Sequence, residues 1–181
     1  AELGTPTLLI DCDLRKSEFR NKYNIRSDEA LTGVAHYLAG KATLDDATYQ
    51  TNVPNGYMIP VNTTVANPSI LLENDRFARM IRESRERFGC VLIDTPPLGS
   101  VADALKIATH CDGTVLVVRS GETPRKLVEN SVQLLHRTET PLLGVVLNRA
   151  DIGSKSNMYY RRYYRSGYYN SEYGYGQKKH K

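Results

Sequence analysis

The sequence predicts a layered α/β fold built on a doubly wound, mostly parallel sheet. Between residues 7 and 148, short runs rich in Val, Ile and Leu alternate with longer segments of helical periodicity. The short runs are apolar at successive positions, which is typical of parallel strands covered on both faces. With 181 residues and 40% hydrophobic content, the chain is long enough to build one compact core.

Four of the apolar runs are the predicted core strands, and they span 7–10, 90–93, 114–118 and 142–147. A fifth run at 57–61 is weaker, because Pro60 has no backbone N–H to donate. That proline favours a sheet edge or the end of a strand for this run.

Four segments between the strands are predicted to be helical. One spans about 31–38 and ends at Gly40, and another covers about 101–109. A third begins near 67–69 and gathers an apolar face from Phe77, Met80, Ile81, Ser84 and Phe88. A fourth begins at Thr123-Pro124, with the proline in its first turn, and its stripe comprises Leu127, Val128, Ser131, Leu134 and Leu135.

The composition changes abruptly after Asp151, so we predict a folded domain at 1–151 and a tail at 152–181. The tail holds eight of the twelve tyrosines and almost no aliphatic residues, which predicts disorder. It is also basic: from Arg149 onward eight Lys and Arg face two acids, against 16 and 18 in the preceding residues. Charge alone leaves nucleic acid and anionic membranes open as partners of the tail.

Composition also indicates in which cellular compartment the chain lies. No run approaches the roughly 20 apolar residues of a membrane-spanning helix, and the first residues lack signal-peptide character. The three cysteines, Cys12, Cys90 and Cys111, form no CxxC spacing and read as reduced, mostly buried thiols. We therefore expect the chain to be soluble and cytoplasmic.

The first chemical motif is Leu8-Leu9-Ile10-Asp11-Cys12-Asp13-Leu14-Arg15. It places two carboxylates, two residues apart, at the C-terminal end of a buried strand, where open α/β sheets bind ligands. Residues two apart on a strand share a face, so Asp11 and Asp13 can aim at one cation if the strand extends that far. Arg15 can then meet a phosphate or a carboxylate. The alternative is a plain acidic turn after a strand.

The second motif is Val91-Leu92-Ile93-Asp94-Thr95-Pro96-Pro97, again an apolar strand that ends in an acid. P-loop ATPases hold the water shell of Mg²⁺ with such an aspartate. The alternative for Asp94 alone is a loop cap. A third strand ends at Asn148-Arg149, where a side-chain amide can offer a donor and an acceptor to a purine edge, or simply end the strand in a turn.

These motifs together resemble one family. The order LLIDCDLR, NPSILL, VLIDTPPLGSVADA, DGTVLVVR with Thr123, GVVLNR and clustered tyrosines is similar to that of the bacterial tyrosine kinases. These P-loop NTPases regulate capsule and exopolysaccharide synthesis, and the resemblance covers nearly the whole chain. It implies a P-loop NTPase fold, with the first motif as the variant Walker A′ and the second as Walker B.

The resemblance also implies site roles and partners. Asp11 and Asp13 would serve Mg²⁺ and activate the attacking tyrosine hydroxyl, Asp94 would hold Mg²⁺ through water, and Asn148 and Arg149 would lie beside the base of ATP. The implied partners are a transmembrane activator of the polysaccharide co-polymerase type, further copies in a ring, and a tyrosine phosphatase, with no nucleic acid. The implied place is the cytoplasmic side of the bacterial inner membrane.

One part of the family pattern is missing, because no G-x-x-x-x-G-K-[ST] occurs in the sequence. The stretch from Gly33 to Gly40-Lys41 has the wrong spacing and lacks the Ser or Thr. In the family that loop, its strand and its helix precede the Walker A′ strand. We therefore expect this chain to be a fragment that neither binds ATP tightly nor phosphorylates itself, because backbone amides and a lysine that grip phosphates are absent.

The tail tyrosines come mostly in adjacent pairs, separated by Arg, Ser, Gly and Asn. As phosphorylation sites they would be Tyr159, Tyr160, Tyr163, Tyr164, Tyr168, Tyr169, Tyr173 and Tyr175. Each phosphate adds about −1.5 to −2 charges, so a few reverse the tail's basic excess. The alternative functions are an ATP-switch ATPase of the partition or division-site type, and a non-catalytic fragment whose Tyr/Arg tail binds RNA or a partner.

Overall fold

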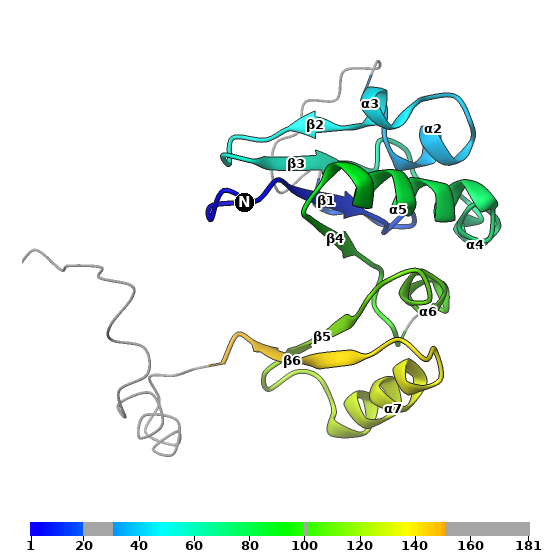
Figure 1. The fold of residues 1–181 in the computed structure, drawn as a ribbon. Coiled ribbons are helices and arrows are strands. Elements are labelled where there is room, and N and C mark those ends of the chain that lie inside the picture. Colours follow the sequence, from blue (N-terminus) through cyan, green and yellow to red (C-terminus); the bar gives the residue numbers. More distant parts are fainter. Residues whose placement is uncertain (20–30, 100, 151–181) are drawn as a thin grey trace, which may run out of the picture.

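The computed structural model describes residues 1–19, 31–99 and 101–150, and these form a mixed α/β domain (Figure 1). The strands are β1 (Thr7–Asp11), β2 (Tyr49–Gln50), β3 (Gly56–Ile59), β4 (Cys90–Asp94), β5 (Thr114–Arg119) and β6 (Leu142–Asn148). The helices are α2 (Val34–Leu38), α3 (Leu44–Ala47), α4 (Pro68–Leu72), α5 (Asp75–Arg87), α6 (Asp103–Ala108) and α7 (Arg125–His136). The proposed tail at 152–181 lies outside the described residues.

The strands form two sheets in the described part of the chain. The first has the order β2-β3-β1-β4, with β1 parallel to both β3 and β4 and with β2 antiparallel at the edge. The second is a parallel pair of β5 and β6. Figure 1 shows them as separate units that are joined through α6. All five predicted strands are therefore present, and Pro60 follows the end of β3, as its missing N–H favours.

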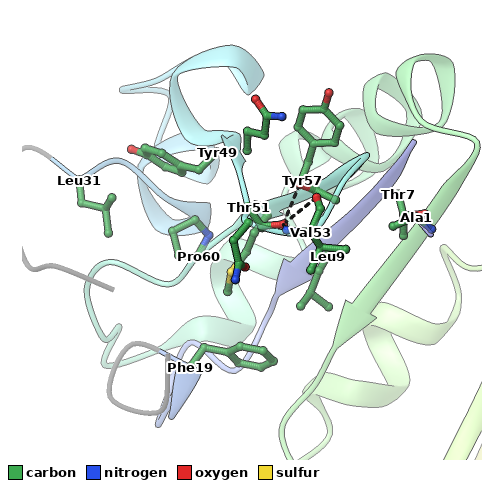
Figure 2. A pocket seen from close by; sticks show the side chains of 14 residues that line it. Ala1, Thr7, Leu9, Phe19, Leu31, Tyr49, Thr51, Val53, Tyr57 and Pro60 are labelled. Carbon is green, nitrogen blue, oxygen red and sulfur yellow. Dashed lines mark hydrogen bonds between the residues drawn. The ribbon is translucent and has the colours of Figure 1, made fainter. Parts of the chain in front are cut away.

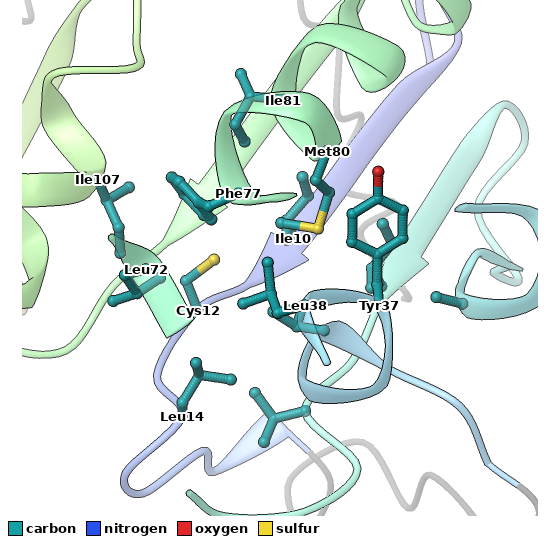
Figure 3. Close-up of a cluster of buried hydrophobic side chains, with 14 of the residues drawn as sticks. Ile10, Cys12, Leu14, Tyr37, Leu38, Leu72, Phe77, Met80, Ile81 and Ile107 are labelled. Atoms are coloured by element: carbon teal, nitrogen blue, oxygen red, sulfur yellow. The ribbon is translucent and has the colours of Figure 1, made fainter. Parts of the chain in front are cut away.

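The core lies between the first sheet and the helices, and β1 is its centre. Leu8 and Ile10 of β1 are fully buried, as are Phe77 and Met80 of α5. Figure 3 shows Phe77, Met80 and Ile10 gathered with Cys12 and Leu38 in one cluster. The apolar face predicted for α5 is confirmed, since the helix also buries Ile81 and Ser84.

The helix ends follow local chemistry. The segment that begins at Pro68 is a separate short helix, α4, and α5 starts afresh after Asn74, whose side chain accepts a hydrogen bond from the Arg76 N–H at 3.0 Å. The prediction of one helix running on from 67–69 was therefore wrong. The predicted stop at Gly40 is confirmed, because Gly40 follows α2 with a φ of 75°, which glycine adopts without strain. Pro124 is the N-cap of α7 rather than part of its first turn.

One face of β4 and one face of β5 carry large apolar side chains that are open to solvent. Leu92 is 53% exposed, and Val115 and Val117 are 54% and 62% exposed. A strand that is apolar on both faces is typical of a sheet with both faces covered, and an uncovered apolar face of this kind is unusual. Cys90 at the start of β4 is exposed for the same reason, so the prediction that it is buried was wrong, whereas Cys12 is buried.

Candidate functional site

The two strand-end acids meet at one edge of the sheet. Asp11 of β1 and Asp94 of β4 are direct partners in the parallel ladder, and the Cys12 N–H continues the ladder by donating to the Asp94 carbonyl at 2.8 Å. Adjacent parallel strands run in register here, so two acids that lie 83 positions apart in sequence end side by side. The two acidic strand ends singled out in the sequence thus lie side by side in the fold.

The chain turns immediately after Asp11. The strand ends there, so the shared face predicted for Asp11 and Asp13 does not arise from strand geometry. The Asp11 carboxylate accepts the Asp13 N–H at 3.1 Å and the Ser17 hydroxyl. Asp13 accepts the Arg15 and Lys16 N–H groups at 3.2 and 2.9 Å. These side-chain to backbone bonds build a tight turn from short polar residues.

A cleft of about 700 Å³ opens beside this turn, and both motifs contribute to it. Its lining residues are Asp13, Arg15, Lys16, Glu18, Phe19, Asp94, Thr95, Pro96, Pro97 and Val101. The cleft therefore combines carboxylates, cationic side chains and an apolar wall within one space. It is the place where sequence-predicted residues from separate segments come together.

The carboxylates in and behind the cleft suit a cation, since Asp13 and Asp94 line it and Asp11 lies buried beside Asp94. Burial raises the pKa of Asp11, which has no exposed surface. Burial, and then the negative charges of Asp11 and Asp13, raise the pKa of Asp94. A cation among these groups would relieve that repulsion. Within the described ranges no three acidic, histidine or cysteine side chains already form a metal cluster, so a Mg²⁺ ion there would keep waters or phosphate oxygens as ligands.

Arg15 lies at the rim of the cleft and forms an ion pair with Asp103, the first residue of α6. Its Nε donates to Asp103 Oδ2 at 2.8 Å, and the Ser69 hydroxyl donates to Asp103 Oδ1 at 2.7 Å. The Arg15 guanidinium holds the pKa of Asp103 below its ordinary value. Sequence reasoning missed Asp103 and Ser69, because an acid at a helix start reads as an ordinary first-turn residue.

The third motif lies apart from the acids. Asn148 ends β6, and its Oδ1 accepts the N–H of Arg149 at 2.8 Å. Arg149 itself has a φ of 54°, so the chain turns there. Neither residue lines the cleft, and the structure does not bring them together with Asp13 and Asp94. The eight tyrosines predicted as phosphorylation sites lie outside the described residues.

A second pocket of about 490 Å³ lies next to β1 and β3 (Figure 2). Leu9, Tyr57, Phe19 and Pro60 are among its mainly apolar lining residues. Its hydrogen bonds, such as Thr51 Oγ to the Gly56 carbonyl at 2.9 Å, complete a turn rather than offer a reactive group. With no acid, histidine or cysteine in its lining, it is a weaker candidate for chemistry than the acidic cleft.

Sequence comparison finds named relatives over most of the chain. It is 37% identical over 151 residues to the tyrosine-protein kinase CpsD of Streptococcus agalactiae, which covers 83% of this chain and 65% of that protein. It is 33% identical over 162 residues to the tyrosine-protein kinase Wzc of Salmonella typhimurium, which covers 88% of this chain and 22% of that protein. The chain thus spans less than two thirds of the length of either relative. No family model matches.

Structure comparison also finds kinase domains among the similar proteins. The VpsO kinase domain superposes with a TM-score of 0.76 at 30% identity, covering 83% of this chain and 73% of that one. The kinase domain of the Escherichia coli tyrosine kinase ETK gives 0.73 at 29% identity, covering 80% and 55%. The septum site-determining protein MinD of Pyrococcus horikoshii, solved with Mg-ADP, gives 0.66 at 22% identity, covering 83% and 61%. The predicted fold class, an α/β P-loop NTPase type, is confirmed.

Proposed function

The chain belongs to the bacterial tyrosine-protein kinase family, and from this premise we propose that it carries the metal-facing half of an ATP-dependent tyrosine autokinase site. The observation that carries the proposal is the pairing of Asp11 with Asp94 beside a cleft that also holds Asp13 and Arg15. In this proposal Asp13 and Asp94 face Mg²⁺ from the lining of the cleft, Asp11 supports them from its buried position behind the turn, and Arg15 faces the phosphates of ATP. The ion supplies charge neutralisation of the phosphate oxygens when it is bound.

The proposed reaction is phosphoryl transfer from ATP to a tyrosine on another copy of the same protein. The phenol oxygen attacks the γ-phosphorus, the bond from that phosphorus to the bridging oxygen breaks, and ADP leaves. We assign the phenol proton to Asp13, because its carboxylate lines the cleft. The apolar wall of Pro96, Pro97 and Val101 suits the ring of a tyrosine, whose body is apolar and whose tip is polar.

The phosphate-gripping half of the site is proposed to lie outside these 181 residues. The sequence contains no G-x-x-x-x-G-K-[ST] loop, and the chain spans only 65% of the length of CpsD. We place the strand that carries the loop at the unpaired edges of β4 and β5, and its helix over the uncovered apolar faces on which Leu92 and Val117 are exposed. The 181-residue chain alone should therefore be inert.

Calorimetry tests this division of the site. Titration of ATP with Mg²⁺ into the 181-residue chain should give no binding in the micromolar range, whereas the full-length gene product should bind. Micromolar binding by the 181-residue chain alone would overturn the proposal that the phosphate loop lies elsewhere.

The proposed substrate is the cluster of eight tail tyrosines, of which Tyr159 is the first and Tyr175 the last. The tail is basic, and the cleft is lined by three carboxylates against two cationic side chains, one of which is already paired with Asp103, so the remaining negative charge favours docking before transfer. Phosphorylation would then reverse the charge of the tail and release it. We place the transfer between subunits of a ring-shaped oligomer, and assign removal of phosphate to a tyrosine phosphatase.

The wider setting is also a proposal. Among the described residues no helix is long and apolar enough to cross a membrane. We propose that the protein works at the cytoplasmic side of the inner membrane with a transmembrane activator of the polysaccharide co-polymerase type, and that it regulates capsule or exopolysaccharide export. Asn148 and Arg149 keep their proposed place beside the base of ATP.

Mixed-subunit labelling tests the transfer step: a full-length chain with a dead site should be labelled by an active chain that lacks the tail.

A further inference from the structure

The cationic side chain of the cleft is held by a carboxylate from another element. Arg15 belongs to the turn after β1, and Asp103 begins α6, 88 positions later. The guanidinium makes a two-point contact, with Nε at 2.8 Å from Oδ2 and Nη2 at 3.4 Å from Oδ1. Such a fork fixes the plane of the guanidinium as well as its position.

Asp103 is itself immobilised. It is 1% exposed, and the Ser69 hydroxyl of α4 donates to its Oδ1 at 2.7 Å, so both carboxylate oxygens are engaged. It does not line the cleft. Any influence of Asp103 on chemistry in the cleft must therefore pass through Arg15.

The ion pair also connects the two loops that flank the cleft. On one side, Asp13 accepts the backbone N–H groups of Arg15 and Lys16, so the side chain of Arg15 is anchored in the same turn as the Asp13 carboxylate. On the other side, Asp103 follows the loop that leaves Asp94 at the end of β4. The contact thus adds a side-chain link between the Asp13 turn and the start of α6, beside the backbone ladder that joins β1 and β4.

Arg15 keeps part of its surface toward the cleft. Its side chain is 37% exposed and lines the cleft together with Asp13 and Asp94. A guanidinium has five N–H donors, and the contact with Asp103 uses two of them. The fork therefore presents the remaining donors in a preset direction, which lowers the reorganisation needed when an anion arrives.

We propose that Asp103 is a positioning residue of the nucleotide site, which orients Arg15 and holds the Asp13 turn against the Asp94 loop. The inference rests on the proposed kinase function, but the clamp itself can be tested without activity. Groups of this kind, one contact removed from the reacting centre, change metal affinity or activity by about 10–100-fold when they are altered.

The first test uses the 181-residue chain and hydrogen exchange. Asp103→Asn should speed amide exchange at Arg15 and Lys16, because the neutral amide loses the charge-assisted fork. Asp112→Asn is the matched control, since it alters an Arg–Asp pair with Arg85 at 2.9 Å whose side chains are 55% and 80% exposed. That control should leave the exchange at Arg15 and Lys16 unchanged. Unchanged exchange in Asp103→Asn would refute the clamp.

The second test uses the full-length gene product and steady-state kinetics at varied Mg²⁺. Asp103→Asn should lower kcat by about 10–100-fold while the KM for ATP stays near that of the wild type, and Asp103→Glu should restore part of the loss. Arg15→Lys keeps the charge but lacks the guanidinium fork, so it should lower kcat as Asp103→Asn does. Because it breaks the same contact from the other side, the test does not depend on whether Asp103→Asn folds. If Asp103→Asn has the kcat of the wild type but faster amide exchange, Asp103 has a purely structural role and the proposal that it positions the nucleotide site is refuted. An inactive wild type would instead refute the kinase function and leave the exchange result standing.

Discussion

Asp11 and Asp94 are direct partners across the β1–β4 ladder, and burial raises the pKa of both carboxyl groups. Two acids set side by side in this way destabilise the fold unless something positive arrives between them. The two carboxylates therefore repel each other at the end of the sheet where the cleft opens, and a bound cation would reduce that repulsion.

Replacing Asp94 by Asn should stabilise the 181-residue chain at pH 7 while it removes function from the full-length protein. A carboxyl group whose pKa is raised on folding favours the protonated form, so its ionisation costs stability as pH rises through the folded pKa. The gain should be small, about 0.5–1 kcal/mol, because Asp94 is partly open to water. Urea unfolding at pH 7 measures it.

The same comparison at low pH is the control. Near pH 3 the carboxyl of Asp94 is protonated in the wild type, so Asp94→Asn should then make little difference. Mg²⁺ should raise the stability of the wild type more than that of the variant. A variant that is less stable than the wild type at pH 7 would contradict the repulsion between Asp11 and Asp94.

Asp103 should show the opposite pH dependence. Arg15 lowers its pKa on folding, so the stabilisation is present above the unfolded pKa and is lost as pH falls through the folded one. Asp103→Asn should cost about 1–3 kcal/mol at pH 7, as for other bonds to charged groups, and less near pH 2. Chemical unfolding across this pH range checks the result, and a constant loss at all pH values would contradict it.

A cavity at the centre of the core should lower the free energy of unfolding strongly. Phe77 of α5 is fully buried against β1, so Phe77→Ala should cost about 3–5 kcal/mol. Ile70 of α4 is 64% exposed and serves as the matched control, because Ile70→Ala should change stability by about 0.5 kcal/mol or less. Similar losses for the two variants in urea unfolding would contradict the assignment of the core.

The exposed face of β5 should tolerate charge in this chain but not in the full-length protein. Val117 is 62% exposed, so Val117→Lys should leave the stability of the 181-residue chain within about 0.5 kcal/mol. If a further strand pairs with β5 and its helix covers this face, the same change should weaken ATP binding by the full-length protein. Normal ATP affinity of that variant by calorimetry would show that the strand lies elsewhere.

Much of this arrangement could be predicted from local sequence. The runs that end in Asp11 and Asp94 identify buried strands, and parallel pairing places their ends together. The short elements α3 and β2 could not be predicted, because four and two residues carry too little periodicity, although Thr43 and Asp46 form a capping box at α3.

Other features depend on contacts that sequence does not display. The role of Asp103 arises from a partner 88 positions away, and its burial comes from packing between α4 and α6. The exposure of Cys90 follows from the uncovered face of β4, which it shares with Leu92, rather than from its apolar neighbours in sequence. Local pattern thus located the acids of the cleft, while tertiary contacts decided how they are held.

The most direct test of the account is phosphate mapping by mass spectrometry on the full-length gene product after incubation with ATP and Mg²⁺. The account predicts phosphate on tyrosines between Tyr159 and Tyr175, and none in an Asp94→Asn variant that is folded to the same extent. Absence of phosphotyrosine from the wild type, or equal labelling of the variant, would contradict an autokinase whose site includes Asp94.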